Sequence, residues 1–323
     1  MAWPTWREAT ERALYGPGGF FRRAEGRPAA HFRTSVHASP LFASALHELA
    51  RQAGLRTVVD VGSGGGELLA ALHRLDLTLT LIGVDLRPRP ADLPDAVTWT
   101  DRLPPTAGAL LVANEWLDDV PVDVAELTEG GWRLRLVDPE TGREQLGPQP
   151  DEPDLGWLAR WWPAAPGARA EIGRPRDDAW AGAIRSLTDG LAVAIDYAHT
   201  RDSRPTTGSL TGYRGGRPVP PVPDGSCDLT SHVALDACAV AGEQAGATTS
   251  LLTTQRAALQ ALGVRRARPA HEQATADPAG YLRALGRAGQ AGELTDPHGL
   301  GGFGWLVQGV GIELPQPVTG TDA

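Results

Sequence analysis

The stretch TVVDVGSGGGE (residues 57–67) is followed along the chain by LIGVD (residues 81–85). A short apolar run, a glycine turn, a helical segment at 67–75 and a second apolar run that ends in Asp85 predict one strand–helix–strand unit. The leucines of the helical segment fall on one side, as expected for a helix that packs on a sheet. A unit of this kind holds its glycine turn against a ligand that contains a nucleoside.

The glycine turn favours S-adenosylmethionine (SAM) over a nicotinamide or flavin dinucleotide. Gly62, Gly64 and Gly66 let the backbone turn sharply and approach a ligand without a Cβ in the way. The dinucleotide fingerprint continues with a small residue for close helix–strand packing, whereas this chain has Glu67, whose carboxylate would also repel a pyrophosphate. SAM has no phosphate, and its sulfonium and amino groups are cationic, so acids near the turn are compatible with it.

We therefore predict SAM as the cofactor, with Asp85 accepting hydrogen bonds from both ribose hydroxyls at the end of the second strand. The alternative is a glycine-rich turn that binds no ligand, but strand, turn, helix and acidic second strand occur together here. This binding mode needs no metal ion. The predicted cofactor-binding residues are Asp60, Gly62, Ser63, Gly64, Gly66, Asp85 and Asn114.

The composition is that of an acidic globular protein. The chain has 323 residues and a formal net charge of −9, with a pI of about 5.4, which disfavours a broad nucleic-acid surface. All 30 basic residues are arginines, and this bias is typical of a GC-rich, bacterial genome. Cys227 and Cys238 are too few for a disulfide framework or a zinc quartet. Because neither a signal core nor an apolar run of membrane-spanning length occurs, we expect a cytoplasmic protein without membrane insertion.

Strands that alternate with helices predict an α/β fold with a doubly wound, mostly parallel, Rossmann-like sheet. Residues 1–56 are predicted to form a helical N-terminal cover, with helices at 5–15 and 40–53 and loops at 15–21 and 31–37. Residues 57–323 form the core, with insertions at about 121–175 and 200–245 over the acceptor site. The core strands are predicted at 57–61, 80–84, 96–99, 108–113, 191–197, 247–253 and 303–310. Other predicted elements are a β-hairpin at 122–136, helices at 154–163, 176–189, 232–244, 255–262 and 278–287, and a long loop at 200–231.

Polar residues at the carboxyl ends of the later strands are candidates for chemistry, because ligands of such sheets bind at that edge. Asn114 and Glu115 follow an apolar strand directly, and Glu115 could hold a cationic or hydroxyl acceptor in line with the methyl donor. The alternative is a helix-capping or solvated acid. Asp196 ends another strand, and a structural acid is the alternative there.

His232 is the remaining candidate, as a general base in the segment DLTSHV (residues 228–233). This segment predicts a helix entry, with Asp228 or Thr230 as the cap and His232 in the first turn. The alternative is that Asp228 only caps the helix and His232 only packs. The candidate catalytic residues are thus Glu115, Asn114, Asp196 and His232.

Taken together, these motifs resemble the MidA-like class I SAM-dependent methyltransferases over nearly the whole chain. The resemblance rests on the glycine turn, on ANEWLDDVPV (residues 113–122), on GSLTGYRG (208–215) and on DLTSHV, with further matches at 19–21, 32–35, 40–42, 195–197, 253–255 and 301–306. It implies a class I methyltransferase fold. It also implies an arginine nitrogen of a protein as methyl acceptor, because mitochondrial members act on an arginine of a respiratory complex I subunit.

The chain departs from the family at two positions. His37 stands where the family has an acid, and Asp123 stands where it commonly has a histidine, so recognition of a protein arginine could differ here. Methylation of a small molecule of secondary metabolism, on oxygen or nitrogen, is therefore a second hypothesis. A non-catalytic assembly factor on the same scaffold is a third, although the intact glycine turn and Asp85 argue against it. The sequence leaves open whether the chain forms a homodimer.

Overall fold

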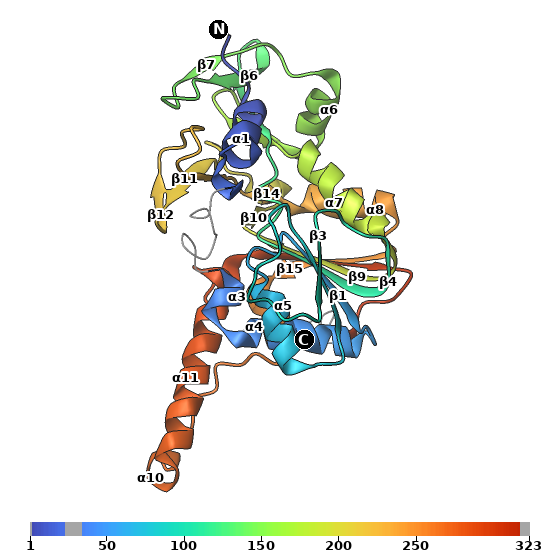
Figure 1. Cartoon of the computed structure of the whole chain (residues 1–323). Helices are drawn as coiled ribbons and strands as arrows, with labels where there is room; N and C mark the ends of the chain where they lie inside the picture. Colours follow the sequence, from blue (N-terminus) through green and yellow to red (C-terminus); the bar gives the residue numbers. More distant parts are fainter. Residues whose placement is uncertain (1, 23–33, 317–323) are drawn as a thin grey trace.

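The computed structural model describes residues 2–22 and 34–316. Its centre is a seven-stranded sheet in the order β15-β16-β9-β4-β1-β2-β3 (Figure 1). Neighbours among β3, β2, β1, β4 and β9 pair in parallel, whereas β16 runs antiparallel to both β9 and β15. The predicted α/β class with a mostly parallel sheet is confirmed. The strands are β1 (Thr57–Val61), β2 (Thr80–Val84), β3 (Val97–Thr100), β4 (Thr106–Asn114), β9 (Leu187–Asp196), β15 (Thr249–Thr254) and β16 (Gly304–Val310).

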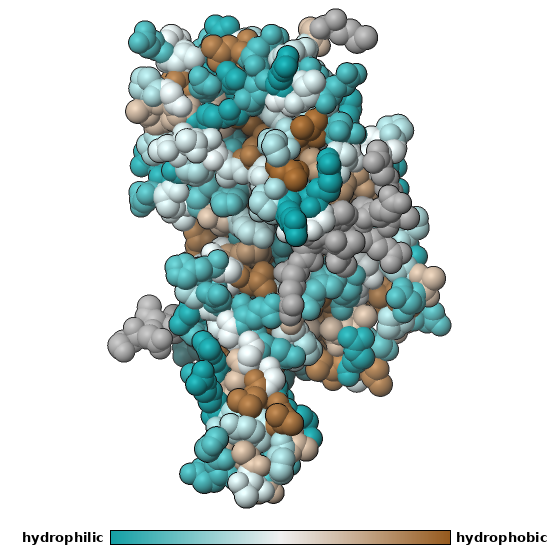
Figure 2. Space-filling view, turned by 90° about the vertical axis from the view of Figure 1, so that its left-hand side faces the viewer, coloured by the Kyte–Doolittle hydropathy of each residue, from teal (hydrophilic) through white to brown (hydrophobic). Residues whose placement is uncertain are grey.

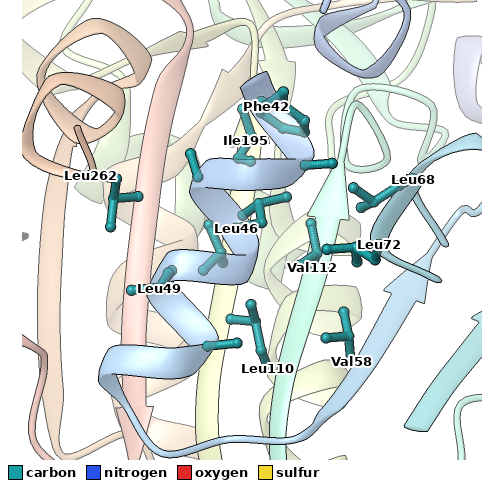
Figure 3. Close-up of a cluster of buried hydrophobic side chains, with 14 of the residues drawn as sticks. Phe42, Leu46, Leu49, Val58, Leu68, Leu72, Leu110, Val112, Ile195 and Leu262 are labelled. Atoms are coloured by element: carbon teal, nitrogen blue, oxygen red, sulfur yellow. The ribbon is translucent and has the colours of Figure 1, made fainter. Parts of the chain in front are cut away.

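Helices cover both faces of this sheet because its central strands are apolar on both sides. One face packs on α4 (Pro40–Gln52), α5 (Glu67–Leu75), α9 (Gln255–Ala261) and the end of α11 (Pro278–Leu294). Figure 3 shows Phe42, Leu46 and Leu49 of α4 in the same cluster as Val112 of β4 and Ile195 of β9. The opposite face packs on α7 (Arg174–Ser186) and α8 (Leu235–Ala245). This double cover leaves the carboxyl edge of the strands as the place for a site.

A second layer lies beyond that carboxyl edge, at the top of Figure 1. It is a four-stranded sheet in the order β7-β6-β5-β8. Helix α1 (Trp6–Tyr15) packs on one face through Trp6, and α6 (Glu152–Trp161) packs on the other through Trp157 and Leu158. The hairpin predicted at 122–136 is present as the first two strands. The strands are β5 (Asp123–Thr128), β6 (Gly131–Val137), β7 (Glu144–Leu146) and β8 (Arg169–Ile172).

The long loop predicted at 200–231 contains a small sheet, so that prediction is wrong in part. Its strands are β11 (Thr211–Arg214), β12 (Arg217–Val219) and β13 (Asp228–Thr230). The helix entry predicted at Asp228 is also wrong, because β13 pairs with β11 and its backbone groups are used in that ladder. Two short strands, β10 (Ala198–His199) and β14 (Val233–Ala234), flank this small sheet along the chain and pair with each other in parallel. Helix α8 begins only at Leu235.

Several further boundaries differ from the prediction; α11, for example, continues to Leu294, beyond the predicted end at 287. The helix predicted at 176–189 ends at Ser186, because Leu187 already pairs with Thr106 of β4. The loop predicted at 31–37 is in part a helix, α3 (Ser35–Ala38), while residues 31–33 lie outside the described part. The remaining short elements are η1 (Phe20–Arg22), η2 (Arg201–Ser203), η3 (Leu300–Gly302) and α10 (Gln273–Ala276).

Helix α11 projects away from the body, with α10 at its far end (Figures 1 and 2). Only its last turns are anchored, through the buried residues Ala288, Ala291 and Leu294. On the projecting part Leu282 is 67% exposed, and Figure 2 shows apolar residues at this end of the molecule. Within residues 2–22 and 34–316, no helix combines the length and the apolar character needed to cross a membrane.

Candidate cofactor and acceptor site

The glycine turn between β1 and α5 has a backbone that side chains would disturb. Gly62, Gly64 and Gly66 have φ angles of 71°, 62° and 75°, in the left-handed region that glycine adopts without strain. A Cβ on Gly62 would stand 2.9 Å from Cδ1 of Trp116, and one on Gly66 would stand 2.6 Å from Cδ1 of Leu93. Conformation therefore favours glycine at all three positions, and space adds to this at Gly62 and Gly66.

Hydrogen bonds tie this turn to the end of β2. The backbone N–H groups of Gly62 and Ser63 donate to the carbonyl of Val84, at 2.9 and 3.2 Å. The Gly64 N–H donates to Oδ2 of Asp85 at 2.8 Å, and the Arg87 guanidinium pairs with the same carboxylate, its Nε 3.1 Å from Oδ1. Asp85 thus lies beside the turn, as predicted. A ribose would reach both of its oxygens by displacing Arg87.

Two hollows meet at the turn, and both include Gly62, Glu115 and Asp119. The larger one has a volume of about 550 Å³, within the roughly 300–1,000 Å³ usual for small-molecule sites. Because Asp85 and Trp116 line it, we name it the nucleoside hollow; its other lining residues include Tyr15, Val84, Leu86, Arg87, Asp101 and Leu103.

The second hollow is narrower, about 80 Å³, and we name it the acceptor hollow. The glycine turn forms one side of it, and Asn114 and Glu115 lie at the end of β4. Its other lining residues are Thr34, Val36, His37, Asp60, Ser63, Glu67, Leu68, Asp118, Tyr197, Asp228 and Thr230. Segments that are far apart in the sequence therefore converge here: the start of α3, three strand ends and β13.

Glu115 has an unusual backbone at the junction of the hollows. Its φ of 51° is the single left-handed value among the non-glycine residues that the structure describes. Such a conformation costs free energy and tends to occur at functional sites. Nδ2 of Asn114 donates to its Oε1 at 3.1 Å, and the backbone of Ser35 hydrogen-bonds its carboxyl group. Burial raises the pKa of Glu115 to about 8, so a nearby cation would favour its charged form.

Three buried aspartates lie behind Glu115, and one buried guanidinium supports them. Asp118 and Asp228 are 7% and 4% exposed, and Asp196 is fully buried. Burial raises the pKa of each of these carboxyl groups above its usual range. Arg176 of α7 is 2% exposed and donates to the carbonyls of Asp118, Val120, Ser231 and His232 and to the hydroxyl of Ser231. This arginine joins the segment after β4 to the segment after β13.

Two of the predicted catalytic residues lie outside the lining of both hollows. Oδ2 of Asp196 accepts from the backbone N–H groups of Leu117 and Asp118, at 3.0 and 3.2 Å, so it holds the segment that carries the acids. His232 is exposed, and its ring stacks on Tyr197 with centroids 5.6 Å apart. Asp123, one of the two family departures, accepts from the N–H of Arg7 and caps α1 away from the hollows. The other departure, His37, lines the acceptor hollow.

The sequence analysis named no role in ligand binding for several residues that line the hollows. Asp101 directly follows β3, so the strand-end argument used for Asp85 could have found it. Tyr197 follows Asp196 and could have been included in the same way. Thr34, Asp118, Asp228 and Thr230 carried no such signal, because only the tertiary structure brings them to the strand edge.

Comparison with known proteins agrees with this geometry. Residues 84–253 match the family model described as "Putative S-adenosyl-L-methionine-dependent methyltransferase". The chain belongs to this family. No curated protein matches the chain.

Two solved structures from Burkholderia thailandensis are similar over nearly the whole methyltransferase chain. One is a protein bound to S-adenosyl-homocysteine, with 27% identity, a TM-score of 0.78, and coverage of 96% of this chain and 89% of that one. The other is a native structure from the same superfamily, with 26% identity, a TM-score of 0.79, and coverage of 98% and 90%. The protein is a SAM-dependent methyltransferase of the class I fold, and its cofactor is SAM, as the sequence predicts.

The residues present in the methyltransferase suit that cofactor. The glycine turn has no side chains that would keep a ligand away from its backbone, and Asp85 lines the nucleoside hollow. Asp60 is 4% exposed, and burial raises the pKa of its carboxyl group to about 8; a cationic sulfonium or ammonium nearby would stabilise its charged form. Oδ1 of Asn114 is buried and has no hydrogen-bond partner among the described residues, so it can accept from a ligand.

Replacing Asp85 with alanine is expected to weaken binding of S-adenosylhomocysteine (SAH) tenfold or more. Hydrogen bonds from two ribose hydroxyls to a carboxylate are charge-assisted, and each contributes roughly 1.5–3 kcal/mol. Isothermal calorimetry measures the affinity. Asp95→Ala is the matched control, because Asp95 is a fully exposed acid close along the chain. An unchanged affinity of Asp85→Ala would place the ribose elsewhere.

Proposed function

We propose that the methyltransferase acts on a nitrogen of a cationic acceptor, in the first place the guanidinium of an arginine side chain in a protein. One observation supports this above all: carboxyl groups outnumber bases in the acceptor hollow. Glu115, Asp118, Asp119 and Asp228 line it together with Asp60 and Glu67, and His37 is the only basic residue in the described lining.

The electrostatics of these acids favour a cation. Burial raises the pKa of Glu115 to about 8 and that of Asp228 to about 7. The protein alone therefore offers these two carboxylates too little positive charge and too few hydrogen bonds to offset the loss of water. Oδ1 of Asp118 and Oδ1 of Asp228 are buried without a hydrogen-bond partner among the described residues. A guanidinium offers planar N–H donors to such oxygens and keeps its charge when it is desolvated.

The shape of the hollow supports a slender acceptor. Its volume of about 80 Å³ suits the tip of an extended side chain better than a bulky ring system. Tyr197 forms an aromatic wall and packs on Phe303 with ring centroids 4.2 Å apart, and a planar cation can stack on such a ring. SAM supplies an electrophilic methyl group, and the residues of this chain contribute chiefly by positioning the acceptor nitrogen toward it.

The proposal also assigns a role to each of the segments that the sequence predicts around the core. We propose that residues 1–56 cover the site, since Glu11, Tyr15 and His37 line the hollows. The insertion at 200–245 contributes Asp228 and Thr230 to the acceptor hollow. The insertion at 121–175 adds only Pro121 to the described lining, so its proposed part is to hold α1 in place.

The test is to locate the methyl group after reaction. The protein is incubated with isotopically labelled SAM and defined peptides that present arginine, lysine, serine or tyrosine, and with protein and metabolite extracts; mass spectrometry then assigns the labelled atom. Label on arginine nitrogen is the expected result, and it should form about a hundredfold more slowly with Glu115→Gln. Label only on small hydroxyl compounds would favour the small-molecule methyltransferase instead. Binding of SAH without any label would favour the non-catalytic assembly factor.

A further inference from the structure

Thr34, His37 and Glu67 form a connected group on the side of the acceptor hollow next to the glycine turn. Oγ1 of Thr34 lies 2.7 Å from Nδ1 of His37, and Nε2 of His37 lies 3.4 Å from Oε1 of Glu67. The other oxygen of Glu67 accepts from the Gly65 N–H at 2.9 Å, so the carboxylate folds back over the turn. The proposed arginine site counts Glu67 among the acids of the hollow but gives none of these three residues a direct contact with the acceptor.

When His37 is protonated, His37 and Glu67 present a positive and a negative charge side by side. The His37–Glu67 contact is long for a hydrogen bond, and the side chains are 28% and 39% exposed, so both retain room for a ligand. The amino-acid end of SAM carries an α-ammonium and an α-carboxylate on one carbon. A zwitterion of this kind matches an adjacent cation and anion, because each ligand charge meets its opposite. Asp60 lies beneath the same turn and adds a second acid.

We propose that Thr34, His37 and Glu67 bind the amino-acid end of SAM. The imidazolium of His37 and the hydroxyl of Thr34 donate to the α-carboxylate, and Glu67 accepts from the α-ammonium together with Asp60. This assigns a ligand role to His37. It depends on the cofactor and is independent of the acceptor.

The protonation of His37 makes the proposal sensitive to pH. Hydrogen bonding to Glu67 raises the pKa of His37 above its usual value, and the charge of Glu115 acts in the same direction. These two acids are the charged groups that face the ring; α11, which also packs near α3, presents Gln290 to Ser39. A raised pKa means that the imidazolium persists to higher pH than in a free histidine and is lost as the pH rises through the folded-state value.

The experiment compares two ligands that differ only in the amino-acid end. SAH carries it, whereas 5′-methylthioadenosine keeps the nucleoside and thioether without it. His37→Gln is expected to weaken SAH about tenfold, since the lost bond to a charged group is partly exposed, and to leave methylthioadenosine unchanged. His47→Gln is the control, because His47 pairs with Asp76 at 3.3 Å with similar exposure, far from the hollows. Calorimetry gives both affinities.

The pH dependence adds a second readout. The ratio of SAH dissociation constants, His37→Gln over the unchanged protein, should fall toward one between pH 6 and pH 9; titration of the ligand's own amino group cancels in this ratio. Equal loss of both ligands would show a general disturbance of the turn and overturn the proposal, as would an unchanged SAH affinity. If His37→Gln unfolds, Thr34→Val tests the same assignment, with a smaller loss of SAH expected and none of methylthioadenosine.

Discussion

Replacing Glu115 with glutamine is expected to lower turnover about a hundredfold while SAH affinity changes little. The substitution keeps the shape of the side chain and its contact with Asn114 but removes the charge that would hold a cationic acceptor. A loss of this size is the scale on which a misplaced reactant slows a reaction. Cofactor binding should largely be spared, because the ribose is expected at Asp85 at the end of β2, although Glu115 also lines the nucleoside hollow.

Single-turnover methylation of an arginine peptide, together with calorimetry of SAH, measures both quantities. Glu129→Gln is a suitable control, since Glu129 is exposed in the turn between β5 and β6 and lines neither hollow. If SAH binding collapses while the bound complex turns over normally, Glu115 is a cofactor ligand. If neither changes, the carboxylate is structural and the acceptor contact is better sought at Asp118 or Asp228.

Replacing Arg176 with methionine is expected to destabilise the protein by about 3–5 kcal/mol, the cost of leaving buried charges without their partner. The guanidinium makes hydrogen bonds to the segments after β4 and β13, and its charge lowers the pKa values of Asp118 and Asp196 against the effect of burial. Methionine fills much of the volume but neither donates nor compensates charge.

Urea denaturation at two pH values measures this effect, with Arg185→Met as control because Arg185 is exposed on the same helix. Acids with raised pKa values bind more protons in the folded than in the unfolded state, so stability falls as the pH rises. The loss in Arg176→Met should therefore be larger at pH 8 than at pH 6, since removing the guanidinium raises the pKa values of Asp118 and Asp196 further above those of the unfolded state. A loss below 1 kcal/mol at both pH values would contradict the assigned role.

The local sequence pattern was enough to predict the strand–turn–helix–strand unit at the centre of this protein. The strand–turn–helix–strand unit at 57–85 needed no distant contact to be predicted, because apolar strands buried on both faces and a turn that only glycine adopts leave a direct signature. β1, β2 and α5 have the predicted bounds. The same signature predicted SAM and put Asp85 at the strand edge, and the end of a later strand put Asn114 there, since parallel strands bring their carboxyl ends to one edge.

The tertiary structure alone decided what surrounds that centre. Asp228 lies at the site because β13 pairs with β11 rather than starting a helix, and such pairing between distant segments has no periodicity in the sequence. His37 meets Glu67, and Arg176 meets Ser231, across 30 and 55 positions of the chain. Asp196 is a strand-end acid like Asp85, yet its partners are backbone N–H groups of the next segment. Sequence placed acids at the strand edge, and packing decided which of them face a ligand.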